Sequence, residues 1–210
     1  MTTDEILNEL EIMFPNAHCE LVHVNPFELA VAVALSAQTT DVAVNKVTPA
    51  LFEKYPNPKL MAEASVKEIE EYIKKLGLFR NKAKNLKGMA TVLVEEFDSV
   101  VPNTMEELLR LPGIGRKSAN VILSVAYHIP AIAVDTHVER VSKRLGLAYK
   151  NDDVYTVEKK LNKKIKKERW NEAHHLFIFF GRYKCKSYRP DCNNCPFIHI
   201  CKYQKQKQSQ

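Results

Sequence analysis

The stretch RLPGIGRKSAN, residues 110–120, decides the fold. Gly113 and Gly115 lie two residues apart and are followed at once by two cations, Arg116 and Lys117. Leucines precede the glycines and an apolar helical pattern follows them, so the short connection predicts a tight hairpin of two helices. The first of these is a short helix predicted at 104–111, with a capping box of Thr104 and Glu107. Both glycines can adopt positive φ and can let another backbone approach closely.

The hairpin has two interpretations. A helix that begins at Arg116 would present the amide groups of its first turn and the positive end of its dipole, a combination that binds anions such as a DNA phosphate. The alternative is a plain glycine turn between helices. The Arg-Lys pair favours phosphate binding. The formal net charge of +6, from 31 Lys plus Arg against 25 Asp plus Glu, favours a polyanionic partner only mildly.

Lys117 falls in the first turn of the helix predicted at 116–127, where the dipole disfavours an ammonium ion. Burial would act in the same direction, and the neutral amine that results is a nucleophile. The alternative is a lysine that stays charged and contacts a phosphate group. The local sequence alone favours this alternative.

Asp135 follows the apolar run PAIAV and precedes a helix predicted at 135–145. As an N-cap it would accept backbone N–H groups and stay ionised, although Thr136 with Glu139 could form the capping box instead. An ordinary helix cap is the simpler interpretation. The functional one is a carboxylate that accepts a proton or stabilises a cation.

Helix follows helix along the rest of the chain, which has 210 residues, is 45% hydrophobic and contains only six glycines. Thr2 and Glu5 predict a capping box, FELAVAVALSA predicts a buried helix, and VKEIEEYIKKLGL predicts an amphipathic helix that ends at Gly77. The longest nearly apolar run, 27–37, is too short to span a bilayer, and the N-terminus does not resemble a signal peptide. These features predict a cytoplasmic all-α protein.

Four of the five cysteines form the pattern C-x6-C-x2-C-x5-C, at Cys185, Cys192, Cys195 and Cys201. Four thiols so close together in a cytosolic chain indicate a metal site. The spacing favours an iron–sulfur cluster, whereas zinc sites usually use two close pairs of ligands. Zinc, disulfides and free thiols stay open as alternatives. Lys186, in the first loop of the pattern, is a candidate contact to phosphate.

Three motifs occur together in one order: LPGIGRKSAN, AVDTHVERVSKRLG and the cysteine pattern. With NPFELAVAVALSAQTTDVAVNK and LGLFRNKAKNL, they resemble the endonuclease III family of helix-hairpin-helix DNA glycosylases over essentially the whole chain. The resemblance implies an all-α, two-domain fold. A six-helix bundle at 21–130 would carry the helix-hairpin-helix at about 104–127. Residues 1–20 and 131–210 would form a cluster domain, with one 4Fe–4S cluster held by the cysteine loop 185–201.

The resemblance also implies roles for single residues. Lys117 matches the lysine that forms a Schiff base, and Asp135 matches an essential aspartate. Gln38 matches a residue that fills the gap left by a flipped base, Leu78 matches a wedge between bases, and Asp41 matches a position that lines the base pocket.

The implied activity is a bifunctional DNA glycosylase and abasic-site lyase of base excision repair. It would remove oxidised or damaged pyrimidines, and then cut the strand 3′ to the lesion by β-elimination. The implied partner is double-stranded DNA with damaged pyrimidines or abasic sites, and no membrane. The protein is expected to be a nucleoid-associated monomer in the cytoplasm. A binding module without catalysis and a zinc-bound structural protein are the alternatives of other classes.

Overall fold

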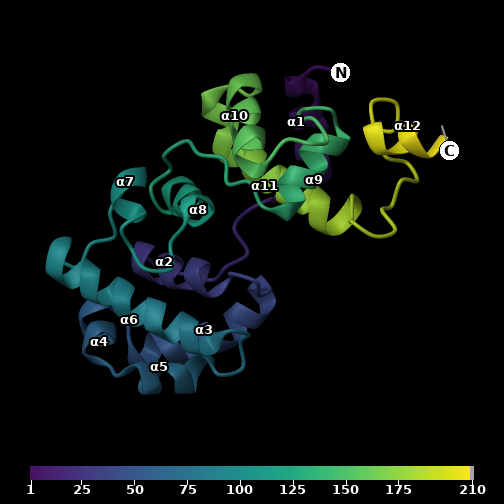
Figure 1. Ribbon diagram of the computed structural model, residues 1–210. Coiled ribbons are helices and arrows are strands. Elements are labelled where there is room, and N and C mark those ends of the chain that lie inside the picture. Colours follow the sequence, from purple (N-terminus) through teal and green to yellow (C-terminus); the bar gives the residue numbers. More distant parts are fainter. Residues whose placement is uncertain (209–210) are drawn as a thin grey trace. The chain divides into compact units, whose positions relative to one another are not determined.

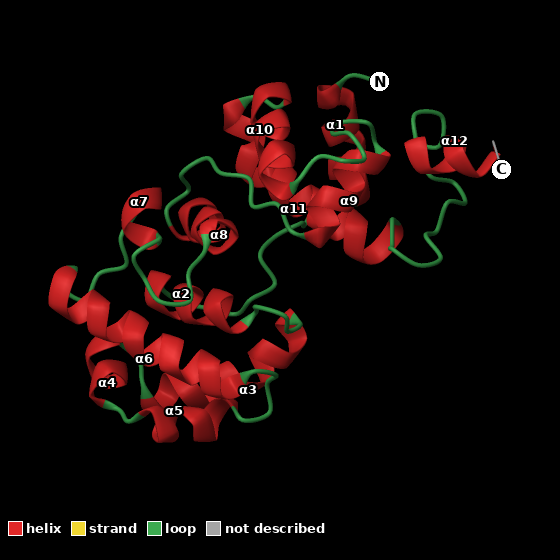
Figure 2. Ribbon diagram, viewed as in Figure 1, coloured by secondary structure: helices red, strands yellow, loops and turns green. Residues whose placement is uncertain are grey.

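The computed structural model describes residues 1–208, and every regular element within them is a helix (Figures 1 and 2). This confirms the all-α prediction. No helix among these residues is both long and apolar enough to cross a membrane. In chain order the elements are α1 (Thr3–Met13), α2 (Pro26–Leu35), α3 (Asp41–Lys54), α4 (Pro58–Glu63), α5 (Val66–Ile73), α6 (Phe79–Glu96), α7 (Met105–Leu108), α8 (Arg116–Ala126), α9 (Thr136–Arg144), α10 (Val154–Lys164), the 3-10 helix η1 (Lys167–Arg169), α11 (Trp170–Phe179), the π-helix η2 (Phe180–Lys184) and α12 (Lys202–Gln208).

The chain divides into two compact units. The hairpin unit is Cys19–His128, and the cysteine unit is Met1–His18 together with Ile129–Gln210. The first and last parts of the sequence therefore belong to the same unit.

Helix α2 is the centre of the hairpin unit. Every residue from Phe27 to Leu35 is buried, which confirms the helix predicted to be apolar on all sides. Its start is fixed locally, because the Asn25 side chain accepts a hydrogen bond from the N–H of Glu28 and Pro26 takes the first helical position. In Figure 1, α2 lies between α8 and the pair α3 and α6, and it packs against all three.

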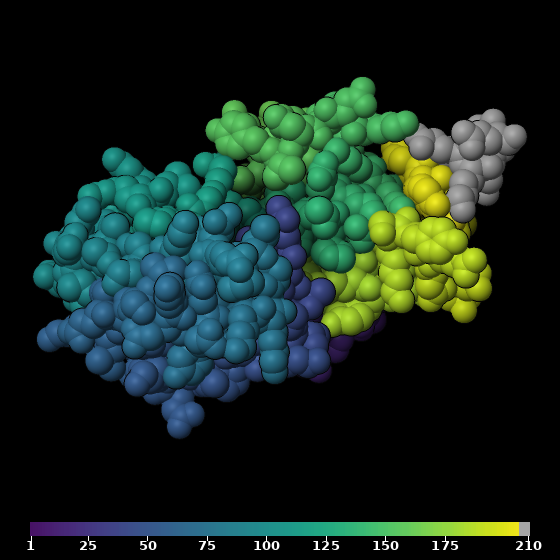
Figure 3. Space-filling model, turned by 60° about the horizontal axis from the view of Figure 1, so that its bottom comes forward, coloured from purple at the N-terminus to yellow at the C-terminus, as the bar shows by residue number. Residues whose placement is uncertain are grey.

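The remaining helices of this unit pack on α6 and on each other. Helices α4 and α5 pack on α6, and α3 packs on α5. Leu51, Ile69 and Leu86 are fully buried in these contacts, and burying each such side chain contributes about 1.5–3 kcal/mol. Figure 3 shows the side chains of the hairpin unit, in blue and teal, forming a continuous close-packed surface.

The helix predicted to end at Gly77 ends earlier, at Ile73. A turn follows in which the N–H of Leu76 donates to the Ile73 carbonyl at 2.9 Å. The residue with left-handed φ in this connection is Leu78, at 57°, and not the glycine. A leucine in this conformation costs about 1–2 kcal/mol, so its surroundings must hold it there.

The cysteine unit is built around a core to which each of its larger helices contributes. Leu7 of α1, Val138 of α9, Leu161 of α10 and Phe177 of α11 are completely buried in this core. Thr2 and Glu5 form the predicted reciprocal capping box at the start of α1.

Phe197 joins the cysteine-rich segment to the same core. It is fully buried, and its ring contacts that of Phe180 edge-on, with centroids 5.3 Å apart. The loop that carries the cysteines is thus attached to the hydrophobic core of its unit.

His175 gives the cysteine unit a pH-dependent stability. Burial, with a smaller effect from His18, lowers the pKa of His175 from 6.5 to about 4. The unfolded chain therefore binds more protons than the folded chain between these values, so the free energy of unfolding should fall as the pH falls from about 6.5 to about 4. The loss reaches about 3 kcal/mol, from about 1.4 kcal/mol for each pKa unit.

We expect His175→Gln to flatten this part of the pH profile, because the amide does not titrate. Urea unfolding of both proteins at several pH values between 4 and 7 measures the difference, and carboxylates that titrate in both cancel from it. Parallel profiles for the two proteins would contradict the assignment to His175.

Candidate functional site

The predicted helical hairpin is present, with a shorter first helix than expected. Helix α7 ends at Leu108 rather than at Leu111. Thr104 caps it by accepting from the N–H of Glu107, but its hydroxyl also donates to the Glu107 carboxylate at 2.6 Å, which replaces the expected reciprocal capping box. The turn closes where the N–H of Ile114 donates to the Leu111 carbonyl at 3.0 Å.

The two glycines of the hairpin have different conformations. Gly113 has φ of +86°, and an added Cβ would lie 3.0 Å from Cβ of Asn85 on α6. Gly115 has φ of −102°, so only Gly113 uses the positive φ that glycine allows. It is the N-cap of α8 and needs the extended conformation of a cap residue. A Cβ at Gly115 would meet nothing within 4 Å, so this position is open to an approaching backbone.

Helix α8 begins directly after Gly115 without a side-chain cap, and Arg116 and Lys117 are exposed in its first turn. The following residues, from Ala119 to Ser124, are buried and hold the helix in the unit. Lys117 is therefore exposed rather than buried. The lysine is open to a large ligand.

We expect substitution of Gly113 to affect mainly the stability of the protein, and substitution of Gly115 to affect mainly DNA binding. We expect Gly113→Ala to lower the free energy of unfolding by about 1–3 kcal/mol, because alanine is strained at positive φ and meets Asn85. Gly115→Ala should cost less than about 1 kcal/mol and should weaken DNA binding, since a methyl group then occupies the open approach to α8. Urea unfolding and fluorescence anisotropy with a labelled duplex measure the two effects. Equal stability losses, or unchanged DNA affinity for Gly115→Ala, would contradict this division.

Asp135 is the N-cap of α9, as the simpler interpretation predicted. Its Oδ1 accepts from the N–H groups of His137 and Val138, both at 2.8 Å. The alternative capping box of Thr136 and Glu139 is therefore wrong. The residues from Ala131 to Val134, directly before Asp135, are buried and form no helix or strand. Both cap bonds use one carboxylate oxygen, and the side chain is half-buried.

Burial lowers the pKa of the His137 ring, next to this cap, and the charge of Asp135 opposes that shift. The carboxyl group of Asp135 lies at the N-terminus of α9, where the helix dipole favours negative charge.

Gln38 and Leu78 share two properties that the sequence did not predict. Both are exposed, Leu78 to 57%, and both have left-handed φ, at 54° and 57° respectively. Gln38 lies in the turn between α2 and α3, and Leu78 precedes α6. Asp41 is the first residue of α3, three positions after Gln38.

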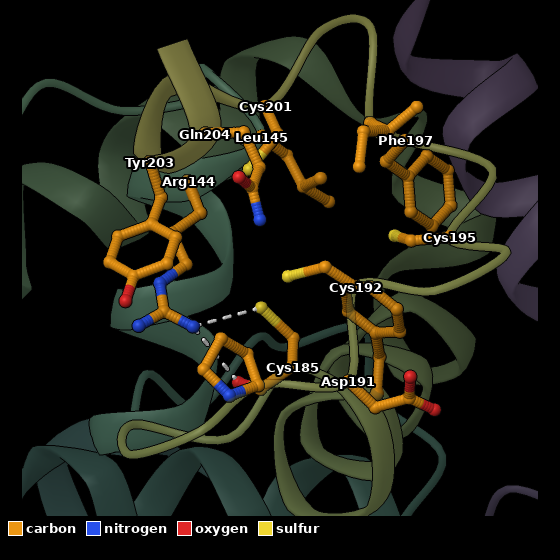
Figure 4. A pocket seen from close by; sticks show the side chains of 13 residues that line it. Arg144, Leu145, Cys185, Asp191, Cys192, Cys195, Phe197, Cys201, Tyr203 and Gln204 are labelled. Carbon is orange, nitrogen blue, oxygen red and sulfur yellow. Dashed lines mark hydrogen bonds between the residues drawn. The ribbon is translucent and has the colours of Figure 1, made fainter. Parts of the chain in front are cut away.

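All four cysteines of the C-terminal pattern border one cavity of about 380 Å³, part of it open to solvent (Figure 4). Among residues 1–208, no three His, Cys, Asp or Glu side chains converge to hold a single metal ion directly. The walls also include Arg144, Leu145, Phe180, Phe197 and Tyr203. The thiols therefore surround a space instead of meeting at a point.

Helix α9 holds the cysteine loop through two arginines that the sequence did not single out. Arg140 donates to the carbonyl groups of Gly181 at 2.8 Å and Cys185 at 3.1 Å. Arg144 donates to Sγ of Cys185 at 3.2 Å and to the carbonyl of Lys186 at 2.8 Å. The backbone of the exposed Lys186 is thereby fixed to the helix that Asp135 begins.

Burial raises the pKa of the Cys185 and Cys195 thiols, whereas Arg144 acts in the opposite direction on Cys185. A bound cation would stabilise the thiolates further, since metal ligands bind in the deprotonated form.

Comparison with known proteins shows the class of protein to which this helical hairpin, with an exposed lysine after its glycines, belongs. The family model of the HhH-GPD superfamily base excision DNA repair protein matches residues 31–167. Endonuclease III of Bacillus subtilis (strain 168) is 53% identical over 196 residues, which cover 93% of this chain and 90% of that protein.

Two solved structures have the same fold. A trapped covalent intermediate of endonuclease III with DNA, an estranged-adenine complex, has a TM-score of 0.94 and 52% identity, covering 99% of both chains. A non-covalent endonuclease III–DNA complex has a TM-score of 0.95 and 51% identity, covering 100% of both chains. The chain belongs to the endonuclease III family, and it is a DNA glycosylase and abasic-site lyase of base excision repair.

Proposed function

We propose that this enzyme acts on double-stranded DNA that contains oxidised or damaged pyrimidines or abasic sites, with Lys117 as its nucleophile. The observation that carries the proposal is the exposed position of Lys117 in the first turn of α8, two residues after the open glycine of the hairpin. A structure of a relative that is 52% identical holds a covalent intermediate with DNA, which supports a nucleophile of this kind.

The hairpin places Lys117 against the sugar of the damaged nucleotide. Backbone amides after Gly113 and Gly115, together with Arg116, bind a phosphate of the damaged strand. This contact holds the nucleophile beside C1′ of a nucleotide that has been rotated out of the helix. Phosphate recognition and attack thus depend on consecutive residues of one short segment.

The Nζ lone pair of Lys117 forms a bond to C1′, and the bond from C1′ to the base breaks, so the base leaves with the bonding electrons and takes up a proton. Opening of the sugar converts the adduct into an imine. The imine acidifies the C2′ proton, whose removal expels the 3′ phosphate by β-elimination and cuts the strand. The same lysine accounts for both the glycosylase and the lyase reaction.

Asp135 is proposed as the carboxylate that accepts a proton or stabilises the cationic sugar and iminium species. Its position as an N-cap supports this role. The hydrogen bonds that Oδ1 accepts from the backbone N–H groups of His137 and Val138 orient the side chain. Both bonds go to Oδ1, so Oδ2 is directed elsewhere.

The other proposed DNA contacts lie on turns and helix ends. Gln38 fills the space of the flipped base, Leu78 separates the bases as a wedge, and Asp41 lines the base pocket. Their exposure supports the first two roles. Lys186 supplies a further phosphate contact from the cysteine loop, whose backbone Arg144 fixes.

One 4Fe–4S cluster is the proposed cofactor, held by Cys185, Cys192, Cys195 and Cys201. The four thiols line one pocket without converging on a point, whereas a single zinc ion needs four ligands about 2.0–2.3 Å from one point. The cluster would stabilise the loop that presents Lys186 and would take no part in bond breaking. We further propose that the protein acts as a monomer at the nucleoid.

Borohydride trapping tests the proposed substrates. The protein is incubated with a duplex that contains one thymine glycol, with an abasic duplex and with an undamaged duplex, and borohydride reduces any imine to a stable adduct. We expect adducts on the first two duplexes only. An adduct on the abasic duplex alone would show lyase activity without removal of this damaged pyrimidine, so the base specificity would lie elsewhere. No adduct on any duplex, with binding retained, would leave a binding module without catalysis.

A further inference from the structure

Lys82 is a buried lysine that has no carboxylate partner among the described residues. It lies on α6 and is only 5% exposed. Its Nζ donates one hydrogen bond, to Oγ1 of Thr39 at 2.5 Å, and burial lowers its pKa. Lysine is almost never buried unless it is paired, and removing its charge from water is unfavourable. Packing alone therefore gives no reason for a lysine at this position.

The hydrogen bonds of Lys82 join the two segments that carry Gln38 and Leu78. Thr39 follows Gln38 directly, and its hydroxyl also donates to the carbonyl of Ala37 at 3.3 Å. The backbone N–H of Lys82 donates to the carbonyl of Leu78 at 3.0 Å, in the first turn of α6. One residue thus bonds to the Leu78 turn through its backbone and to the Gln38 turn through its side chain.

The two connected residues are held in unusual conformations. Gln38 and Leu78 both have left-handed φ, which is unfavourable for a residue with a Cβ. Such conformations persist where the surrounding structure imposes them, and they are common at functional sites. A rigid connection between the two turns is one such constraint.

We propose that Lys82 is a positioning residue: it fixes the Gln38 turn relative to the Leu78 turn, so that both side chains enter the duplex together. This inference rests on the proposed function, in which Gln38 fills the gap and Leu78 separates the bases. Insertion is needed when a nucleotide must leave a base stack. It is not needed when Lys117 meets the aldehyde of an abasic site in single-stranded DNA.

Three variants isolate the hydrogen bond. Lys82→Met removes the donor and keeps an unbranched side chain of similar length. Thr39→Val removes the acceptor with little change of shape, and Thr39→Ser keeps the hydroxyl. Replacing a buried charge with an apolar side chain is often neutral or stabilising, so we expect Lys82→Met to unfold at the wild-type temperature or above it.

Two substrates separate positioning from folding. The first is a duplex with one thymine glycol and 2-aminopurine opposite it, whose fluorescence rises when insertion disturbs its stacking. We expect Lys82→Met and Thr39→Val to lower the single-turnover rate of base removal about tenfold or more, with a smaller rise in fluorescence. Thr39→Ser should behave like the wild type. On a single-stranded abasic oligonucleotide, all variants should form the borohydride-trapped adduct within about twofold of the wild type.

Unchanged rates and fluorescence in Lys82→Met and Thr39→Val would overturn the positioning role. So would parallel losses on duplex and single strand with a lower unfolding temperature, because that pattern describes a residue needed only for folding. A wild-type protein that forms no adduct on either substrate would instead refute the proposed function, and this inference with it. The wild-type control therefore distinguishes the two failures.

Discussion

Lys117→Gln should bind damaged DNA and form no covalent adduct with it. Glutamine keeps most of the length of the side chain and a hydrogen-bond donor, but its amide nitrogen is not a nucleophile. Because one amine is proposed to attack C1′ and to carry the imine, base removal and strand cleavage should both fall, by about 10³-fold or more. Single-turnover assays on a thymine glycol duplex, with borohydride trapping in parallel, measure these losses.

The neighbouring cation provides a matched control. Arg116 lies in the same first turn and is also exposed, so Arg116→Gln removes one charge and leaves the nucleophile. It should weaken binding uniformly across sequences and lower the salt dependence of binding by about one phosphate contact, while the adduct still forms. An adduct of undiminished yield from Lys117→Gln would show that another amine forms the imine.

Asp135→Asn separates charge from capping in the same experiment. Asparagine is as good an N-cap as aspartate, and its carbonyl oxygen can accept the bonds from His137 and Val138 that Oδ1 accepts now. The free energy of unfolding should stay within about 0.5 kcal/mol, and catalysis should slow about 10²-fold. A variant with full activity would reduce Asp135 to a structural cap.

Local chemistry predicted those features that depend on near neighbours in the sequence. The side chains of Thr2 and Asp135 cap their helices by accepting hydrogen bonds from backbone N–H groups two or three residues further along the chain. This spacing is visible in the sequence. The burial of α2 follows from an unbroken apolar run. Fold class and hairpin follow from the same kind of pattern.

The sequence could not reveal features that depend on distant partners. From the sequence alone, Lys82 would be expected on the surface. It is buried because α6 places it beside the turn that contains Thr39, 43 positions away. Arg140 and Arg144 reach the backbone and thiol of Cys185 from 45 and 41 positions away. Such contacts are tertiary, and no local pattern encodes them.

Backbone conformation at single residues was also beyond the sequence. Glycine marks the permissive positions, yet the left-handed residue after α5 is Leu78, and Gly115 adopts a conformation that other residues could share. In both cases the surrounding structure, and not the residue type, determines the backbone conformation. Gly115 is open where a ligand backbone would approach, which is a reason for glycine that φ alone does not show.

Cys195→Ser should remove the proposed cluster and destabilise the cysteine unit. A serine hydroxyl is a poor ligand for iron, since thiolates are what hold such clusters. We expect a colourless protein in place of a brown one, with iron and sulfide contents near zero. The free energy of unfolding of this unit should fall by about 4 kcal/mol or more, because metal binding contributes directly to folding.

Cys19→Ser is the matched control for this change. Cys19 lies in the hairpin unit and does not border the cavity, so colour and iron content should stay as in the wild type. A wild-type protein with one zinc ion per chain and no visible absorbance would identify a zinc site instead. A wild-type protein without metal would contradict both the iron–sulfur cluster and the zinc site, and the four cysteines would then be free thiols.

The position of Cys195 explains why its loss should spread through one unit. Its N–H closes a turn on the Cys192 carbonyl at 3.2 Å, and Phe197, two residues later, is fully buried against Phe180 in the core. A loop released from its cofactor would therefore loosen a core contact. Hydrogen exchange should quicken in α9 and α11 of the cysteine unit. It should stay slow in α2, which belongs to the hairpin unit and packs on α3, α6 and α8.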